Sequence, residues 1–238
     1  MSRVVVVGSG IAGLIAALEI GHQHSVTLVT KAELADSNTR WAQGGIAAAM
    51  FEDVLQSLSA ASGLAGIVVV SVDPTASALA RRYGATVWTD GARDGHTGAV
   101  TLAARGLAAQ GSAMLTMPGD IPRLTAADIA QLLAAHPAGP AFTIAPAWDE
   151  RGSNAILCSP ADLVPLRFGS DSFFPHLAAA RGLGLQPTIV RNASIALDLD
   201  EPADLSRFMA KRSPTRTWEL LDRHRLEWDK APAVIEVQ

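Results

Sequence analysis

The sequence predicts an α/β fold in three α/β/α layers, with an open, mostly parallel sheet between two layers of helices. Short runs of β-branched residues alternate with Ala- and Leu-rich runs of helical period, a pattern typical of parallel strands joined by crossover helices. The chain has 238 residues, of which 49% are apolar and 18% charged, and this composition excludes a disordered protein. We therefore expect residues 1–238 to form a single domain.

The predicted strands and helices alternate along the chain. The strands are runs rich in apolar and β-branched residues, at 4–7, 26–30, 67–71, 86–89, 113–117 and 142–146. The helices each have an apolar face of helical period, at 11–21, 47–62, 74–83, 98–109 and 125–135. Thr125 stands three residues before Asp128, which predicts an N-terminal cap for the last of these helices. Residues 146–199 follow a looser pattern, in which we expect substrate loops, and a helix from Pro202 to about Lys211 precedes a charged tail.

Composition argues against several classes of function. A net charge of −4 argues against nucleic acid as a partner, since a phosphate-backbone binder normally carries a clustered basic face. The single cysteine, Cys158, cannot form an internal disulfide and is expected to be a core thiol. Residues 1–18 and 54–72 are apolar but interrupted by Gly and Ser, so we expect neither a signal peptide nor a membrane span. We expect a cytoplasmic protein that binds small molecules and for which a homodimer is possible.

A glycine motif follows the first predicted strand. The strand runs into Gly8-x-Gly10-x-x-Gly13, where glycine allows backbone amides to approach a pyrophosphate at the start of a helix. The candidate cofactor-binding residues are Gly8, Ser9, Gly10, Ile11, Ala12 and Gly13. Lys31 ends the next predicted strand, where a dinucleotide-binding protein has an acidic residue for the ribose, and this argues against NAD.

The glycine motif, Val-Thr-Lys31 and above all Asn38-Thr-Arg-Trp-Ala-Gln-Gly-Gly45 make residues 1–49 resemble the N-terminus of L-aspartate oxidase. That family consists of flavoproteins of NAD biosynthesis. The resemblance implies an N-terminal βαβ fragment of dinucleotide-binding type with FAD as its ligand. One βαβ unit would leave most of FAD exposed, so tight flavin binding is not expected from this fragment.

A second set of motifs follows in order after residue 50. It comprises Met117-Pro-Gly-Asp120, Asp149-Glu-Arg-Gly-Ser-Asn154, Phe168-Gly-Ser-Asp-Ser172 with His176, and Asp198-Leu-Asp200-Glu-Pro-Ala-Asp204. Together these motifs make residues 50–238 resemble the guanylyltransferases that join GTP to 2-phospho-L-lactate or phosphoenolpyruvate in deazaflavin coenzyme synthesis. The resemblance implies a Rossmann-like fold of the nucleotide-diphospho-sugar-transferase (GT-A-like) type. It also implies transfer of GMP from GTP, with release of pyrophosphate.

Nucleotidyl transfer brings several negative charges together, and carboxylate-bound Mg²⁺ can hold them. Asp120 follows a buried run at the C-terminal end of a predicted strand, the usual ligand position in an open α/β sheet. Asp120 with Asp198 or Asp200 is therefore the predicted magnesium site, although Asp120 taken alone could simply cap a turn. Asp204 is expected to be the cap or a first-turn acid of the last helix, with metal binding as the less favoured alternative.

The resemblance also suggests roles for other residues. It implies catalytic roles for Asp120 and for Lys31, which takes the place of the family's first lysine. The residues implied to bind the acceptor's phosphate and carboxylate are Ser153, Asn154, Gly169 and Ser172. His176 is expected to be a packed histidine, because this transfer does not require a strong base.

The two resemblances meet near residue 49, which suggests a chimera. In the guanylyltransferases a strand ending in Pro-Val-Lys is followed by a basic Lys-Ser-Arg-Leu loop. Residues 26–30 can be laid on that strand and Ser37-Asn-Thr-Arg40 on that loop, but the second lysine is absent, so weakened activity is expected. Residues 1–25 would then add an edge or face element to the sheet. A flavin-binding fragment and a scaffold without catalysis stay open as alternatives.

Overall fold

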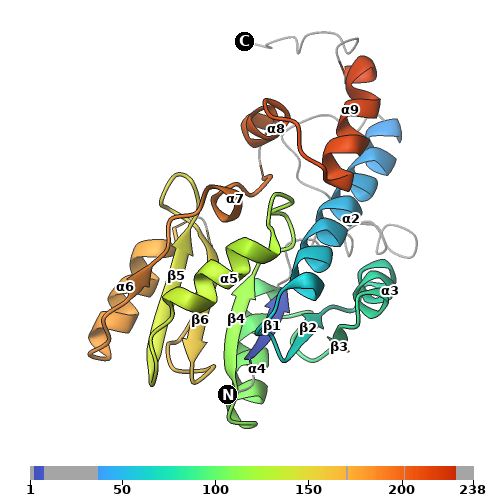
Figure 1. Cartoon of the computed structure of the whole chain (residues 1–238). Helices are drawn as coiled ribbons and strands as arrows, with labels where there is room; N and C mark the ends of the chain where they lie inside the picture. Colours follow the sequence, from blue (N-terminus) through green and yellow to red (C-terminus); the bar gives the residue numbers. More distant parts are fainter. Residues whose placement is uncertain (1–2, 8–36, 170, 201, 229–238) are drawn as a thin grey trace, which may run out of the picture.

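The computed structural model describes residues 3–7, 37–169, 171–200 and 202–228. In these ranges seven strands form one sheet in the order β3-β2-β1-β4-β6-β5-β7 (Figure 1). The strands are β1 (Arg3–Val7), β2 (Gly66–Val70), β3 (Thr86–Trp88), β4 (Ala113–Met117), β5 (Ala141–Pro146), β6 (Ser153–Ser159) and β7 (Thr188–Ile189). Within this sheet β6 runs antiparallel to β4 and β5, and the other pairs are parallel. The predicted α/β fold with a mostly parallel sheet is confirmed.

Helices cover both faces of the sheet. They are α2 (Ser37–Ala60), α3 (Pro74–Arg82), α4 (Gly95–Ala108), α5 (Ala126–Ala135), α6 (Phe173–Gly182), α7 (Ala193–Ala196), α8 (Pro202–Met209) and α9 (Arg216–Trp228). Leu115 and Met117 of β4 share one core cluster with α2, α3 and α5, while Met114 shares the other with α4 and α6. Successive strand residues point to opposite faces, so a strand covered on both sides must be apolar throughout, as β4 is. No helix in the described ranges is both long and apolar enough to span a membrane.

Most predicted elements within the described ranges are confirmed. The strands predicted at 4–7, 67–71, 86–89, 113–117 and 142–146 correspond to β1, β2, β3, β4 and β5. Thr125 caps α5, because the backbone N–H of Asp128 donates to Thr125 Oγ1 at 3.3 Å and the Thr125 N–H donates to Asp128 Oδ2 at 2.9 Å. The strands β6 and β7 lie in the stretch with the looser pattern and were not predicted as separate elements. The predicted helix 11–21 and strand 26–30 lie outside the described residues.

Two predictions about the N-terminal part are wrong. β1 was expected at an edge or on a face, but Val5 pairs with Ile67 of β2 on one side and with Leu115 of β4 on the other. A central position satisfies the backbone groups of β1 on both sides. The segment Ser37-Asn-Thr-Arg40, expected as a basic loop, is the first turn of α2, because the run to Ala60 is rich in helix formers and lacks proline.

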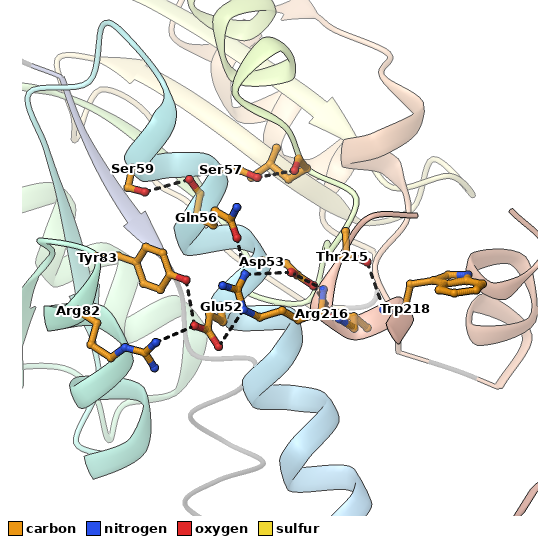
Figure 2. A network of polar contacts seen from close by, with 12 residues as sticks. Glu52, Asp53, Gln56, Ser57, Ser59, Arg82, Tyr83, Thr215, Arg216 and Trp218 are labelled. Carbon is orange, nitrogen blue, oxygen red and sulfur yellow. Dashed lines mark hydrogen bonds and ion pairs between the residues drawn. The ribbon is translucent and has the colours of Figure 1, made fainter. Parts of the chain in front are cut away.

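The C-terminal helix α9 lies beside α2, and a polar network joins the two (Figure 2). The buried Asp53 of α2 accepts hydrogen bonds from Arg216 N at 2.9 Å, Thr217 N at 3.0 Å and Thr217 Oγ1 at 2.6 Å. Glu52, one residue earlier, forms ion pairs with Arg216 and with Arg82 of α3. Asp53 therefore satisfies the free backbone donors at the start of α9 and determines where the tail meets the sheet domain.

Candidate active site

Asp120 lies just beyond the C-terminal end of the central strand β4. The Leu199 N–H donates to the Asp120 carbonyl oxygen at 3.1 Å, which brings the segment with Asp198 and Asp200 against it. Asp120 as a residue is partly exposed, but its Oδ1 atom is buried and has no hydrogen-bond partner among the described residues. Burial, together with the negative charges of Asp200 and Asp198, raises the pKa of Asp120 to about 7. The negative charges of two carboxylates from one distant motif therefore raise the pKa of a third, at the C-terminal end of β4.

The chemistry of this acidic group fits a divalent cation. Mg²⁺ prefers carboxylate oxygens, and a buried carboxylate oxygen without a partner is unfavourable until a cation or a proton satisfies it. Burial also raises the pKa of the half-buried Asp198, whereas Asp200 is exposed. Within the described ranges, no three acidic, histidine or cysteine side chains are close enough as they stand to hold a metal ion. The magnesium site at Asp120, Asp198 and Asp200 therefore stays a prediction.

Asn154 of β6 faces this acidic group. Its Nδ2 donates to Asp198 Oδ1 at 3.1 Å and to the Ile195 carbonyl oxygen at 3.0 Å. A carbonyl oxygen can only accept, so the amide must present its nitrogen here, and both Nδ2 protons are used. The side chain was predicted to bind the acceptor, but in this arrangement its nitrogen is committed to Asp198 and the α7 backbone.

The neighbouring residue of β6, Ser153, belongs to a second buried cluster with Ser172 and His176. Ser153 Oγ lies 3.0 Å from His176 Nδ1 and 3.0 Å from Ser172 Oγ. The other ring nitrogen, His176 Nε2, accepts a hydrogen bond from the Arg167 N–H at 2.9 Å. His176 is 1% exposed, so the predicted packed histidine is confirmed, and burial lowers its pKa to about 4. It is neutral at neutral pH.

The loop that carries Gly169 is held from two sides. On one side His176 accepts from Arg167 N, and on the other the Thr97 Oγ1 of α4 accepts from Phe168 N at 3.0 Å. The Phe168 ring packs edge-on between the rings of His96 and His176, at centroid distances of 4.2 Å and 5.2 Å. A pocket opens beside this loop and is lined by Arg167, Phe168, Gly169 and Asp171. Of the predicted acceptor-binding residues, Gly169 therefore lines this pocket, and Ser172 follows its lining residue Asp171 in the sequence.

Several predicted site residues cannot be placed. Lys31 lies outside the described residues, and so do the glycine-motif residues Gly8, Ser9, Gly10, Ile11, Ala12 and Gly13. The FAD site and the lysine that would contact phosphate therefore stay predictions. Two minor predictions are confirmed: Cys158 is a buried thiol whose pKa burial raises to about 12, and Asp204 lies in the first turn of α8.

Sequence reasoning missed the role of Arg123. Its Nη2 donates to the carbonyl oxygens of Phe208 at 2.6 Å and Lys211 at 2.8 Å, so it holds the end of α8 beside the loop after β4. The only sequence signal was its place three residues after Asp120, because the partners are backbone atoms 85 and 88 residues away. Arg123, three residues after Asp120, therefore holds the end of α8, the helix that begins two residues after Asp200.

Comparison with known proteins determines the family. The profile of the family described as "Guanylyl transferase CofC like" matches residues 25–234, which is most of the chain. The chain belongs to this family. The phosphoenolpyruvate guanylyltransferase of Rubrobacter xylanophilus is 35% identical over 172 residues, which cover 71% of this chain and 82% of that protein. The 2-phospho-L-lactate guanylyltransferase of Methanothermobacter thermautotrophicus is 29% identical over 177 residues, covering 74% and 77%.

Solved structures show the same fold for this CofC-like guanylyltransferase. A putative nucleotide-diphospho-sugar transferase from Desulfovibrio desulfuricans matches with a TM-score of 0.65 at 16% identity, covering 95% of this chain and 96% of that one. A nucleotidyl transferase from Methanothermobacter matches with a TM-score of 0.55 at 18% identity, covering 87% and 95%. The predicted nucleotide-diphospho-sugar-transferase type of fold is confirmed, and the chain is an enzyme of the nucleotidyltransferase class. The family match begins at residue 25 and so includes half of the segment that resembles the oxidase, whose chimeric origin stays a prediction.

Proposed function

We propose that this enzyme transfers GMP from GTP to the phosphate of phosphoenolpyruvate or 2-phospho-L-lactate. An oxygen of the acceptor phosphate attacks the α-phosphorus of GTP, the bond from this phosphorus to the α,β-bridging oxygen breaks, and pyrophosphate leaves. The observation that carries the proposal is the buried Oδ1 of Asp120, which has no partner in the described part of the chain and lies beside the segment with Asp198 and Asp200, in a chain of this family. Mg²⁺ bound by these residues would neutralise charge on the triphosphate.

Different groups of the protein would bind the triphosphate of GTP and the phosphate of the acceptor. Asp120, Asp198 and Asp200 would bind the cation, while Lys31 would add a positive charge at the triphosphate. Ser153, Gly169 and Ser172 would receive the acceptor, because hydroxyl and backbone N–H groups can donate to a phosphate or carboxylate. No covalent intermediate with the protein is required.

The acceptor class rests on the relatives. Phosphoenolpyruvate and 2-phospho-L-lactate, which appear in the names of relatives, are both three-carbon acids with one carboxylate and one phosphate. The pocket beside Gly169 and the paired serines next to Asp171 suit such a small molecule with two anionic groups. The proposal needs no flavin, so flavin absorbance in the purified protein would instead favour the oxidase-like alternative.

The test is release of pyrophosphate from GTP and Mg²⁺, with each acceptor in turn. The wild-type protein is compared with Asp120→Asn, which keeps the shape of the side chain and removes its charge. Asp222→Asn serves as the matched control, because Asp222 is exposed on α9. We expect acceptor-dependent release that Asp120→Asn lowers by about 100-fold or more and that Asp222→Asn leaves unchanged. Folded wild-type protein that releases no pyrophosphate with either acceptor would refute the proposal.

A further inference from the structure

The cluster of Ser153, Ser172 and His176 has more donors than it uses internally. Three side-chain protons are available, one on the His176 ring and one on each serine hydroxyl, while the cluster contains two contacts, Ser153–His176 and Ser153–Ser172. Which ring nitrogen carries the proton therefore determines whether a proton is left for a ligand.

The backbone determines the tautomer. The Arg167 N–H donates to His176 Nε2 at 2.9 Å, and an N–H can only donate, so Nε2 must present its lone pair. In the neutral ring the proton then sits on Nδ1 and is donated to Ser153 Oγ, 3.0 Å away. The opposite tautomer would accept the Ser153 proton, and the two contacts would then use both hydroxyl protons.

The paired serines are consequently a net donor. The Ser153–Ser172 contact uses one hydroxyl proton, and the other hydroxyl proton has no partner among the described residues. Ser172 stands at the N-cap position of α6, yet its side chain makes no capping hydrogen bond to that helix. The hydroxyl that could cap α6 is directed to Ser153 instead, and the first turn of α6 contains no acidic residue. Ser172 Oγ donates to Ser153 Oγ, so the unused hydroxyl proton is on Ser153, beside the N-terminus of α6, and the two together favour an anionic group.

We propose that His176 is a positioning residue for the acceptor. By accepting from Arg167 N and donating to Ser153, it makes the Ser153–Ser172 pair donate its remaining proton to the phosphate or carboxylate of the acceptor. The same ring anchors the loop with Phe168 and Gly169 at the pocket edge. His176 transfers no proton in the reaction and does not touch GTP. This inference rests on the proposed function and extends it to one side chain that orients the acceptor.

Two conservative substitutions separate the two hydrogen bonds of the ring. In His176→Asn the amide nitrogen reaches the position of Nδ1 and can still donate to Ser153, whereas the acceptor for Arg167 N is lost. In His176→Gln the amide oxygen reaches the position of Nε2 and can still accept from Arg167 N, whereas the donor to Ser153 is lost. Both variants remove a buried ring, so comparable losses of melting temperature are expected from the two.

The test measures the Kd of phosphoenolpyruvate by calorimetry with Mg²⁺ and the α,β-methylene analogue of GTP, alongside acceptor KM and GTP KM. We expect His176→Gln to weaken acceptor binding by about tenfold or more and His176→Asn by about threefold or less. GTP KM should not change in either variant. In a Ser153→Ala background the two substitutions should give equal acceptor Kd values, because the group through which His176 acts is gone.

Three results would overturn the proposal. They are equal weakening of acceptor binding by His176→Asn and His176→Gln, a matching change in GTP KM, and an effect of His176→Gln on acceptor Kd that persists in the Ser153→Ala background. The same data separate this proposal from the proposed function. Acceptor binding that responds to His176 and Ser153 as expected, in a protein that releases no pyrophosphate, supports the positioning role and refutes the transfer. If the protein releases pyrophosphate but His176→Asn and His176→Gln give the same acceptor Kd, only the positioning role is refuted.

Discussion

Asn154 Nδ2 donates to Asp198 Oδ1 at 3.1 Å, and its sequence neighbour Ser153 lies in the cluster with His176. Both residues lie in β6 where its register with β5 shifts, and here the strand presents Asn154 to the acidic group and Ser153 to the serine–histidine cluster. The strand therefore connects the predicted cation site with the predicted acceptor site through rigid backbone.

This arrangement predicts that Asn154→Ala acts on the cation and not on the acceptor. Loss of the amide leaves Asp198 free to rotate, and loss of such an outer hydrogen bond typically weakens metal affinity by about 10- to 100-fold. The Mg²⁺ concentration for half-maximal activity should rise accordingly, while acceptor KM at saturating Mg²⁺ stays near the wild-type value. A raised acceptor KM with unchanged Mg²⁺ dependence would instead support direct contact of Asn154 with the acceptor.

The raised pKa of Asp120 predicts a pH dependence of stability. Burial and the charges of Asp200 and Asp198 raise this pKa from 3.8 to about 7, so the folded state holds the proton more tightly than the unfolded state. Asp120 therefore stabilises the metal-free protein below the unfolded pKa, and this contribution is lost as pH rises through the folded pKa. A bound cation replaces the proton, so the gain of melting temperature on adding Mg²⁺ should be larger at about pH 8 than at about pH 5.

Melting curves with Mg²⁺ and with EDTA at the two pH values check this. Asp120→Asn serves as the second variant, because an amide does not titrate and binds Mg²⁺ poorly. In that variant the gain on adding Mg²⁺ should be small at both pH values. Equal gains in the wild-type protein at both pH values would contradict the assignment of Asp120 as a cation ligand.

The strand pattern could be predicted from the sequence because it depends on local composition. Runs such as Ala113–Met117 are short, apolar and bounded, and their burial on both faces requires that composition. The position of β1 could not be predicted, because its neighbours are set by pairing with residues some 60 and 110 positions away, such as Ile67 and Leu115. No local signal distinguishes a central strand of this kind from an edge strand.

The acidic motif was found because Asp120 and Asp198 occur in recognisable strings at strand ends. The roles proposed for Asn154 and His176 could not be predicted from the sequence, because they depend on which atoms face each other in the fold. The sequence predicts a packed histidine at position 176, which burial confirms, but its proposed role depends on a backbone N–H nine residues earlier. Contacts of a side chain with distant backbone leave no residue-type pattern to recognise.

The clamp at the end of α8 predicts a further effect on the acidic group. Arg123 Nη2 holds the carbonyl oxygens of Phe208 and Lys211, and α8 follows directly after Asp200. Arg123→Ala should loosen α8 and raise the Mg²⁺ requirement, whereas Arg123→Lys, which keeps a charged nitrogen donor but lacks the planar guanidinium, should show an intermediate effect. Mg²⁺ titrations of activity test whether the required Mg²⁺ concentration rises from the wild type to Arg123→Lys to Arg123→Ala. An unchanged Mg²⁺ requirement in Arg123→Ala would show that the position of α8 does not affect cation binding.

The joint between α2 and α9 predicts that two adjacent acidic residues differ in their effect on stability. Asp53→Ala removes the acceptor for Arg216 N, Thr217 N and Thr217 Oγ1 and leaves buried donors unpaired, so the free energy of unfolding should fall by about 2 kcal/mol or more. Glu52→Gln removes ion pairs whose arginine partners are 65% and 43% exposed, and the loss should stay below about 1 kcal/mol. Urea unfolding of the two variants measures both values.

Since α9 carries none of the proposed catalytic residues, pyrophosphate release by folded Asp53→Ala at low temperature should match the wild type. A large effect of Glu52→Gln with a small effect of Asp53→Ala would show that the ion pairs, and not the helix cap, hold the tail to the domain.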